Sequence, residues 1–405
     1  MHDKLTAQID AFFSQGMPDR LGVAVSGGSD SVALLMLLSR LPTDLHCVTV
    51  DHGLRETSAQ EAGQVASLCD RLNVPHSTLR WTGWDGIGNV QGEARAARYG
   101  LMSDWAKEQD ICDVALGHTL DDQAETVLMR LARGAGVDGL SAMAPRRSQD
   151  DVTWLRPLLG ATRAELRNFL GIAGVSWIDD PTNDDERFTR IKVRQSWETL
   201  APLGLTPVVL AQVAENMSLA REALAHQASA VAKEIVSFRA GAVEIARDGF
   251  DTVPQEIARR VFLAALTWVN GAVYPPRRRT VEAALAATKQ SGSATLDGCH
   301  VLAAGPSLWI FREFSVVRDM TTSFSETFDD RWRLSGPDVD PNCHVGALGE
   351  EGLAQCPEWR ALGVPRQALL PTPAIWNEST LVAAPVVDPA SPWRADLENQ
   401  SLEFF

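Results

Sequence analysis

The feature that most constrains this chain is an alternation of short strand-like segments with helix-like segments over roughly its first 130 residues. The strand-like segments are residues 21–25, 45–50, 76–81 and 113–117, and the helix-like ones are residues 32–38, 58–72, 90–109 and 121–133. Strands that alternate with helices predict a parallel sheet with helices on both faces. Such a sheet binds ligands beyond the carboxyl ends of its strands, where Ser26, Asp51 and His118 fall.

The remaining chain changes character twice. Several prolines and glycines lie around residue 204, and an alanine-rich helical segment, residues 208–238, follows them. From about residue 319 proline is frequent and the apolar runs are short. We therefore expect an α/β fold in three parts: a Rossmann-like, doubly wound parallel sheet in residues 1–205, a helical linker with a smaller α+β domain in residues 206–318, and a small β-rich domain in residues 319–405.

The composition is that of a globular protein, with 45% hydrophobic and 22% charged residues. The chain is acidic: it has 37 Lys and Arg residues against 52 Asp and Glu residues, which gives a formal net charge of −15. Taken alone, this acidity argues against nucleic-acid binding, since phosphate backbones require a basic surface. A net charge is a sum, however, whereas a binding surface is local.

Three further features together predict a cytoplasmic protein without a membrane anchor. The six cysteines are scattered and form no Cys-x-x-Cys pair, a pattern that fits neither a disulfide framework nor a zinc or iron–sulfur site. The first residues lack the basic region and apolar run of a signal peptide. The sequence has no stretch of about 18 uncharged apolar residues that would predict a transmembrane helix.

The sharpest local motif, S-G-G-S-D-S, lies directly between the first expected strand and its helix. Its glycines let backbone N–H groups approach an anion closely, and the positive end of the helix points at the same place. Asp30 would repel a phosphate, so we expect it to bind a hard cation such as Mg²⁺ that bridges phosphates. The motif has no lysine and so differs from the G-x-x-x-x-G-K-[ST] loop. The predicted cofactor-binding residues of the loop, with Asp30 as the metal ligand, are Ser26, Gly27, Gly28, Ser29, Asp30 and Ser31.

This loop resembles the S-G-G-x-D-S loop of the PP-loop, or N-type ATP pyrophosphatase, superfamily. The resemblance implies that the loop grips the pyrophosphate end of ATP and that ATP is cleaved between its α and β phosphates. Enzymes of the superfamily thereby adenylate an oxygen of their substrate. The resemblance therefore implies activation by AMP transfer, with ATP and Mg²⁺ as cofactors.

Further motifs narrow the resemblance. In chain order they are D-H-G-L-R at 51–55, E-A-R-A-A-R-Y at 93–99, G-H-T-L-D-D-Q-A-E-T at 117–126, R-P-L-L at 156–159, W-I-D-D-P-T-N at 177–183 and R-I-K-V-R at 190–194. Over roughly residues 20–200 this set resembles the tRNA(Ile)-lysidine synthetase family. Residues 277–280, with 308–310, and residues 366–385 resemble the family's later domains more weakly.

The resemblance implies an ATP-dependent ligase that forms a carbon–nitrogen bond. Its substrates are L-lysine and the tRNA(Ile) with a CAU anticodon, and lysine joins C2 of the cytidine at the first anticodon position. The reaction runs through an adenylated cytidine and releases PPi and AMP. The modified base pairs with A instead of G and changes the tRNA from methionine to isoleucine identity. Members of the family are often homodimers.

The chemistry requires a group that handles the lysine amine. The ε-amine must attack as a free base, yet its unperturbed pKa is about 10.4, so the site must remove a proton. Asp122 and Glu125 stand at i and i+3 on one helical face, where a carboxylate pair can hold an ammonium group and one member can accept its proton. The resemblance assigns lysine recognition to these same positions. A solvated, acidic helix N-terminus is the alternative interpretation of this pair.

Other candidate residues leave alternatives open. His118 follows a strand and is predicted to face the nucleotide; the alternative is a hydrogen-bonded histidine of the scaffold. Asp51 and His52 follow the second strand and are predicted to lie near the adenosine; the alternative is a simple turn. Arg190 and Arg194 are spaced as i and i+4 on a helix and are predicted to be catalytic residues that contact the phosphates of ATP or RNA. The alternative is that they pair with the acidic run at 179–186. The predicted tRNA contacts are Arg95, Arg98, Arg277, Arg278 and Arg279.

Two other functions compete with this interpretation. A tRNA thiolase of the same superfamily would need cysteine pairs or a catalytic cysteine near the loop, and Cys112 is not well placed for that role. A non-enzymatic ATP-binding protein would need neither the acidic pair nor the two added domains.

The distribution of charge limits the objection to RNA binding. Residues 319–405 hold 5 basic and 14 acidic side chains, whereas residues 237–318 hold 10 basic and 7 acidic ones. Arginine, the side chain suited to bidentate phosphate contacts, supplies 32 of the 37 basic residues. We therefore expect RNA to bind to an arginine-lined strip along the first two domains, with an affinity that falls as salt rises.

Overall fold

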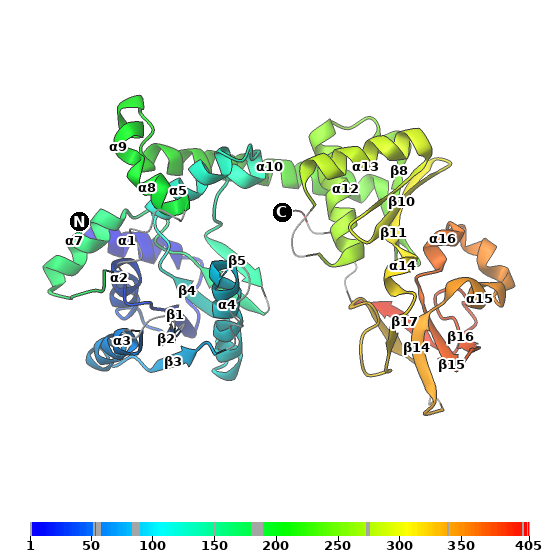
Figure 1. Ribbon diagram of the computed structural model, residues 1–405, viewed down its shortest axis with the longest axis horizontal. Coiled ribbons are helices and arrows are strands. Elements are labelled where there is room, and N and C mark those ends of the chain that lie inside the picture. Colours follow the sequence, from blue (N-terminus) through cyan, green and yellow to red (C-terminus); the bar gives the residue numbers. More distant parts are fainter. Residues whose placement is uncertain are drawn as a thin grey trace. The chain divides into compact units, whose positions relative to one another are not determined.

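The computed structural model describes residues 2–51, 53, 58–82, 90–149, 151–179, 189–272, 276–337, 340–398, 401–402 and 404. The chain forms two compact units, the first ending at Arg221 and the second beginning at Glu222 (Figure 1). This boundary lies inside the long helix α10 (Pro207–Ile235). The domain limits that we place at residues 205 and 318 stay predictions.

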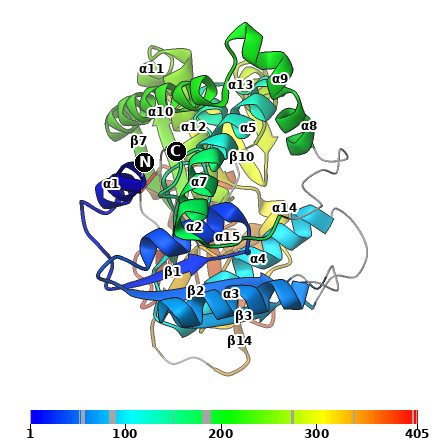
Figure 2. The ribbon, with the colours of Figure 1, turned by 90° about the vertical axis from the view of Figure 1, so that its left-hand side faces the viewer.

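The first unit is built on a six-stranded sheet with the order β3-β2-β1-β4-β6-β5. Its strands are β1 (Arg20–Ala24), β2 (Asp44–Asp51), β3 (His76–Arg80), β4 (Asp113–Leu116), β5 (Arg146–Gln149) and β6 (Val152–Leu155). The neighbours from β3 through to β6 pair in parallel, and only β5 joins the edge antiparallel. Figure 2 shows β1, β2 and β3 side by side. The predicted parallel sheet is confirmed, with an added antiparallel edge strand.

Helices cover both faces of this sheet, as the alternating pattern predicts. Besides α10, the α-helices described in this unit are α1 (His2–Phe12), α2 (Ser29–Leu38), α3 (Ser58–Leu72), α4 (Val90–Glu108), α5 (Leu120–Leu131), α6 (Val137–Leu140), α7 (Arg163–Ala173), α8 (Thr189–Gln195) and α9 (Trp197–Leu200). In Figure 1, α1, α2 and α3 lie to one side of the strands and α4 lies on the other.

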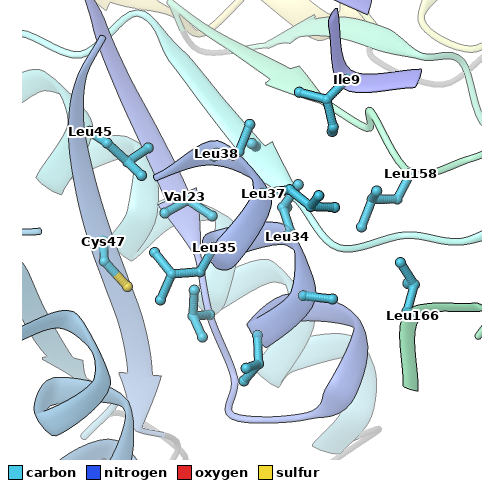
Figure 3. Close-up of a cluster of buried hydrophobic side chains, with 14 of the residues drawn as sticks. Ile9, Val23, Leu34, Leu35, Leu37, Leu38, Leu45, Cys47, Leu158 and Leu166 are labelled. Carbon is cyan, nitrogen blue, oxygen red and sulfur yellow. The ribbon is translucent and has the colours of Figure 1, made fainter. Parts of the chain in front are cut away.

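Two hydrophobic clusters correspond to these two faces. Helices α1, α2, α3 and α7 pack on one face, in a cluster that includes Ile9, Leu34 and Leu166 (Figure 3). On the other face Trp105 of α4 packs with Val114 of β4 and other strand residues. Because α2 is apolar on nearly its whole circumference, most of its side chains are buried. This burial holds the N-terminus of α2 firmly at the end of β1.

The strand order places the ligand-binding edge of the sheet. From β1 the chain proceeds to β2 and β3 on one side, and it then returns to place β4 on the other side of β1. Strands β1 and β4 are therefore neighbours on either side of the point where the strand order reverses, and parallel sheets bind ligands at such a point. The S-G-G-S-D-S loop follows β1, and His118 follows β4. The fold thus brings together residues that lie about ninety positions apart in the chain.

The second unit starts with an antiparallel five-stranded sheet of order β7-β8-β11-β10-β9. Its elements are β7 (Val236–Arg239), β8 (Ala242–Ala246), α11 (Arg247–Phe250), α12 (Gln255–Asn270), α13 (Arg278–Ser291), β9 (Ser293–Leu296), β10 (Cys299–Ala304) and β11 (Ser307–Arg312). Helix α12 buries one apolar face on the sheet, with Phe262 and Leu266 fully enclosed. These features confirm the predicted α+β character of this region.

The last part of the chain is rich in short strands, as predicted. Strands β12, β14, β15 and β16 form one sheet and β13 pairs with β17 in a second. The elements are α14 (Phe314–Val317), β12 (Thr321–Thr322), β13 (Trp332–Ser335), β14 (Cys343–Ala347), α15 (Gly349–Ala354), α16 (Arg366–Leu369), β15 (Pro373–Asn377), β16 (Thr380–Ala383) and β17 (Arg394–Leu397). Among the helices of the described residues, none is both long and apolar enough to cross a membrane.

Candidate active site

The S-G-G-S-D-S loop connects β1 to α2 in a conformation that few sequences allow. Gly27 has a φ of +90°, a backbone conformation that residues with a side chain rarely adopt. A Cβ at this position would also lie 2.6 Å from Cδ1 of Ile178. Gly28 is the N-cap of α2, and no side chain of the described chain caps the helix there. The first N–H groups of α2 are therefore available to an anion.

The serines of the loop bond mainly to the loop itself. The Ser26 N–H donates to Oγ of Ser31 at 3.2 Å, and that hydroxyl donates to the carbonyl of Gly28 at 3.0 Å. The Ser29 hydroxyl donates to Oδ1 of Asp30 at 3.0 Å. Ser29 and Ser31 are buried. These two hydroxyls therefore fix the shape of the loop, which offers backbone N–H groups and the exposed hydroxyl of Ser26 to a ligand.

The end of β4 passes directly against this loop. A Cβ on Gly117 would lie 3.0 Å from the backbone N and Cα of Ser31, so only glycine fits here. The close approach brings His118 and the N-terminus of α5 to the loop. The predicted site residues of α2 and α5 are thus brought together.

Asp122 has a structural role at the start of α5. Thr119 is the N-cap of that helix and its hydroxyl accepts a hydrogen bond from the Asp122 N–H. In return, Oδ2 of Asp122 accepts from the N–H of Thr119 at 2.9 Å and from its hydroxyl at 3.0 Å. This reciprocal capping box fixes the carboxylate and leaves Oδ1 facing the site. The sequence T-L-D-D carried this signal, which our sequence analysis missed.

Three carboxylates meet around one guanidinium group. Arg163 is the first residue of α7, and its Nε donates a hydrogen bond to Oδ2 of Asp30 at 3.0 Å. Its Nη2 is 3.4 Å from Oδ1 of Asp122, and its Nη1 is 3.7 Å from Oε1 of Glu125. Sequence reasoning did not single out Arg163, because nothing in its spacing relates it to Asp30, which lies 133 positions away.

Arg190 and Arg194 of α8 complete the surroundings of Glu125. Nε of Arg194 lies 2.6 Å from Oε1 of Glu125, and Nε of Arg190 lies 2.9 Å from Oε2. Glu125 itself is fully buried. Of the acidic run at 179–186, only Asp179 is among the described residues, and it pairs with Arg167. In the described structure both arginines thus pair with the predicted lysine-binding carboxylate.

The electrostatics of the three carboxyl groups differ. Burial raises the pKa of Glu125, and Arg194 offsets part of that increase. Burial also raises the pKa of Asp30 in spite of the opposing charge of Arg163. Burial also acts to raise the pKa of Asp122, but the positive charges of Arg163 and Arg190 outweigh it, so the pKa of that carboxyl is lowered. Asp122 is therefore the most firmly ionised acid of the group.

His118 is a neutral imidazole beside these acids. Burial lowers the pKa of His118 to about 3. Its Nδ1 is buried without a hydrogen-bond partner in the part of the chain that the structure describes. A buried polar atom without a partner is rare in folded proteins and is often satisfied by a ligand or water. This geometry suits contact with a bound substrate.

Asp51 ends β2, with its side chain largely buried. Its Oδ1 accepts a hydrogen bond from the Gly53 N–H at 2.8 Å, so the simple turn that we considered as an alternative is present. His52 lies outside the described residues.

The predicted RNA contacts Arg95 and Arg98 lie on α4 around Tyr99. Their guanidinium carbons are 5.1 and 5.6 Å from the centre of the Tyr99 ring, which packs edge-on against Trp154. Nε of Arg98 is buried and lacks a hydrogen-bond partner among the described residues. Both cations, with Arg156, act electrostatically on His118 and disfavour its protonation. Arg95, Arg98 and Arg156 therefore form a group of positive charges next to the site.

The remaining candidates lie outside this cluster. Arg277, Arg278 and Arg279 are exposed at the start of α13 in the second unit, where Arg278 pairs with Glu282. All six cysteines are free thiols. In the described ranges, no group of three or more His, Cys, Asp and Glu side chains is arranged to hold a metal ion.

Comparison with known proteins defines the family. Residues 1–199 match the PP-loop domain family. The chain is 48% identical to a tRNA(Ile)-lysidine synthase of Ruegeria pomeroyi over 99% of its own length and 96% of that protein. The chain belongs to the tRNA(Ile)-lysidine synthase family.

More distant members agree with this assignment. A tRNA(Ile)-lysidine synthase of Methylobacterium nodulans is 38% identical over 69% of this chain and 84% of that relative. One from a Wolbachia of Brugia malayi is 32% identical over 78% of this chain and 75% of that relative.

Among solved structures, the chain is similar to a U34-tRNA thiolase of Methanococcus maripaludis. The match covers 53% of this chain and 78% of the thiolase, at 16% identity and a TM-score of 0.47.

This tRNA(Ile)-lysidine synthase family member is an ATP-dependent ligase with a PP-loop, as its sequence predicts. The alternatives that the sequence left open, a tRNA thiolase and a non-enzymatic ATP-binding protein, are not favoured.

Proposed function

We propose that the enzyme joins the ε-amine of L-lysine to C2 of the first anticodon cytidine in the tRNA(Ile) with a CAU anticodon. The observation that carries this proposal is the meeting of Asp30, Asp122 and Glu125 beside the PP-loop. The PP-loop adjoins a cluster of carboxylates that can hold a positively charged amine, and the reaction needs both. We place the reaction in the cytoplasm, and a homodimer stays a prediction.

The first half-reaction is adenylation of the cytidine. The free N–H groups of the loop and of the first turn of α2 would hold the phosphates of ATP. The cytidine O2 would attack the α-phosphorus, the bond to the β-phosphate would break, and PPi would leave. C2 would then carry AMP as a leaving group, which a cytosine carbonyl lacks.

The chain fits the Mg²⁺ that such phosphate chemistry uses. Mg²⁺ is usually held by one or two carboxylates together with substrate phosphates, and Asp30 presents a single carboxylate at the start of α2. Its carboxyl group points into the three-carboxylate cluster, not into solvent. When bound, Mg²⁺ would neutralise charge on the phosphates. Asp30 is the residue that would hold it.

The second half-reaction is attack by lysine. Asp122 and Glu125 would hold the lysine ammonium group and orient its nitrogen toward C2. The ammonium must lose a proton before attack, and Glu125 is the better acceptor because burial raises its pKa. The amine nitrogen then bonds to C2, and AMP departs with the former cytidine oxygen. The neutral His118 can hydrogen-bond to the nucleotide without adding charge.

The arginines supply the RNA contacts of this proposal. Arg95 and Arg98 border the site on α4 and would hold the anticodon phosphates or stack on its bases. Arg190 and Arg194 hold Glu125 in place and remain partly exposed, so their free N–H groups could also bind phosphate. Arg277, Arg278 and Arg279 would contact the tRNA elsewhere.

A labelling experiment tests the proposal. Purified enzyme, Mg²⁺-ATP, radiolabelled lysine and a tRNA(Ile) transcript with a CAU anticodon should yield labelled RNA, with PPi and AMP in equal amounts. The matched control is the same transcript with uridine as the first anticodon base, which should take up no label. Label that stays free, or that joins both transcripts equally, would contradict the proposed reaction. Product formed only with a thiol donor would indicate a thiolase instead.

A further inference from the structure

The side chain of Arg163 occupies the space between the carboxylates that the proposed reaction needs for its own cations. One guanidinium group lies within 4 Å of all three acids, at 3.0 Å from Asp30, 3.4 Å from Asp122 and 3.7 Å from Glu125. Its planar fork of donors suits such bridging, which the point charge of a lysine could not match. In charge and position it occupies the place of a cationic ligand.

The backbone of Arg163 is fixed independently of this bridge. Its N–H donates to Oδ2 of Asp121 at 2.8 Å, and Thr162 before it caps α7 in a capping box with Glu165. Helix α7 also contributes Leu166 to the core beneath α2. The side chain can therefore move away from the carboxylates without unfolding the helix that carries it.

The oxygens of Asp30 and Asp122 are already engaged in hydrogen bonds or ion pairs. Oδ2 of Asp122 accepts both hydrogen bonds from Thr119, so Oδ1, which faces Arg163, is its only oxygen toward the site. Oδ1 of Asp30 accepts from Ser29, and Oδ2 pairs with Arg163. Within the described residues, Arg163 is the only cation in ion-pair distance of either acid.

We propose that Arg163 is a placeholder cation, by which we mean a positioning residue that substrate cations displace. In the free enzyme it holds the three mutually repelling carboxylates together. Mg²⁺ needs its oxygens at about 2.0–2.1 Å and the lysine ammonium needs Oδ1 of Asp122, so each cation must compete with the guanidinium for the carboxylates that it holds. Like charges this close repel strongly. The proposal rests on the proposed function for the identity of the lysine ligand.

This proposal predicts a gain that a merely structural role would not give. If Arg163 competes with substrate cations, its removal should strengthen their binding, although turnover falls because the carboxylates lose their fixed positions. If Arg163 only supports the fold, its removal should weaken binding or leave it unchanged. The sign of the change in affinity therefore separates the two roles.

The experiment measures Mn²⁺ binding, as a probe for Mg²⁺, by the loss of free-ion paramagnetic resonance, and lysine binding by calorimetry. In Arg163→Ala, Mn²⁺ should bind about tenfold or more tightly than in the wild type, because one nearby positive charge is gone. Lysine should also bind more tightly. Arg167→Ala is the matched control, since Arg167 lies one turn further along α7 and pairs with Asp179 outside the cluster. Its affinities should equal those of the wild type.

A second variant and an added ion keep the outcome clear. Arg163→Gln keeps hydrogen-bonding capacity without charge and should show the same gain, so it decides the question if Arg163→Ala does not fold. Millimolar methylguanidinium should weaken Mn²⁺ binding to Arg163→Ala and leave the wild type unaffected. Unchanged or weaker Mn²⁺ binding in the folded variants would overturn the proposal, even if the wild type ligates lysine. A wild type that ligates no lysine would instead refute the proposed function and the lysine part of this proposal.

Discussion

Glu125 is a fully buried carboxylate with cations on two sides, Arg163 on one and Arg190 and Arg194 on the other. The proposed mechanism uses it only after adenylation. Glu125→Gln should therefore keep tRNA-dependent PPi release while lysine transfer falls by about 100-fold. Separate assays of labelled PPi and labelled lysine check this. A parallel loss of both activities would place Glu125 in the adenylation step.

Asp30 should give a different pattern, in which both half-reactions are lost. Asp30→Ala removes the proposed Mg²⁺ carboxylate at the PP-loop, so PPi release should fall by roughly 100-fold or more. Binding of tRNA, measured by filter retention without ATP, should survive because Asp30 makes no proposed RNA contact. If PPi release were unchanged, Asp30 would have no metal role.

His118 gives a prediction about pH. Its pKa is about 3 in the folded protein against 6.5 for an ordinary histidine, so below pH 6.5 the unfolded chain takes up a proton that the folded chain refuses. The folded state thus loses stability as the pH falls, by roughly 2 kcal/mol from His118 between pH 6.5 and 5.

His118→Asn cannot take up this proton. Its melting temperature should therefore fall less between pH 7 and pH 5 than that of the wild type, as measured by circular dichroism. His226→Asn, at an exposed position on α10, is the control and should keep the wild-type slope. Equal slopes for all three proteins would mean that His118 is protonated in the fold.

At the scale of the elements, the connection between β1 and α2 has the strictest geometric requirement. Gly27→Ala would combine a φ of +90° with a contact of 2.6 Å to Ile178. We expect a loss of about 1–3 kcal/mol in stability together with weaker ATP binding. Gly28→Ala is the matched control for stability, because Gly28 has an ordinary φ of −71° and a Cβ there would meet nothing closer than 3.8 Å. Equal melting temperatures for the two variants would contradict this account.

The elements were predictable from sequence where the information is local. The apolar runs predicted β1, β2 and β4, because a buried parallel strand needs such a run. Strand β3 (His76–Arg80) is mostly polar and was predicted from its place in the alternation of strands and helices. The S-G-G-S-D-S loop and the i, i+3 pair in α5 were found for the same reason. The edge strand β5 was not, since Arg146–Gln149 is polar and largely exposed.

The site was less predictable where it depends on contacts between distant segments. Arg163 meets Asp30 across 133 positions, and no periodicity encodes that meeting. Arg190 and Arg194 were found by their helical spacing, but their partner was not, because the nearby acidic run offered an equally good charge match. Only the packing of α8 against α5 selects Glu125. Sequence thus indicates which residues carry charge, and tertiary structure decides which charges meet.

For the whole molecule, the open question is how a chain with a net charge of −15 binds RNA. The basic residues are concentrated locally, and the cluster Arg277–Arg279 is the densest of them. Within it Arg278 is already paired with Glu282, whereas Arg277 and Arg279 form no ion pair among the residues that the structure describes. Each arginine that neutralises a phosphate releases a counterion and steepens the salt dependence of binding by nearly one unit of slope.

The double variant Arg277→Gln, Arg279→Gln should therefore bind tRNA more weakly, and its plot of log affinity against log salt should be shallower by about 1–2. Arg333→Gln is the control, because Arg333 is equally exposed but lies in the acidic last part of the chain and pairs with Glu398. Fluorescence anisotropy of labelled tRNA(Ile) between 50 and 200 mM salt, about the range over which such slopes are resolved, measures both. A slope unchanged from the wild type would exclude phosphate contacts by this cluster. Binding would then depend on the arginines beside the active site, Arg95 and Arg98, and the net acidity of the second unit would act only to repel RNA.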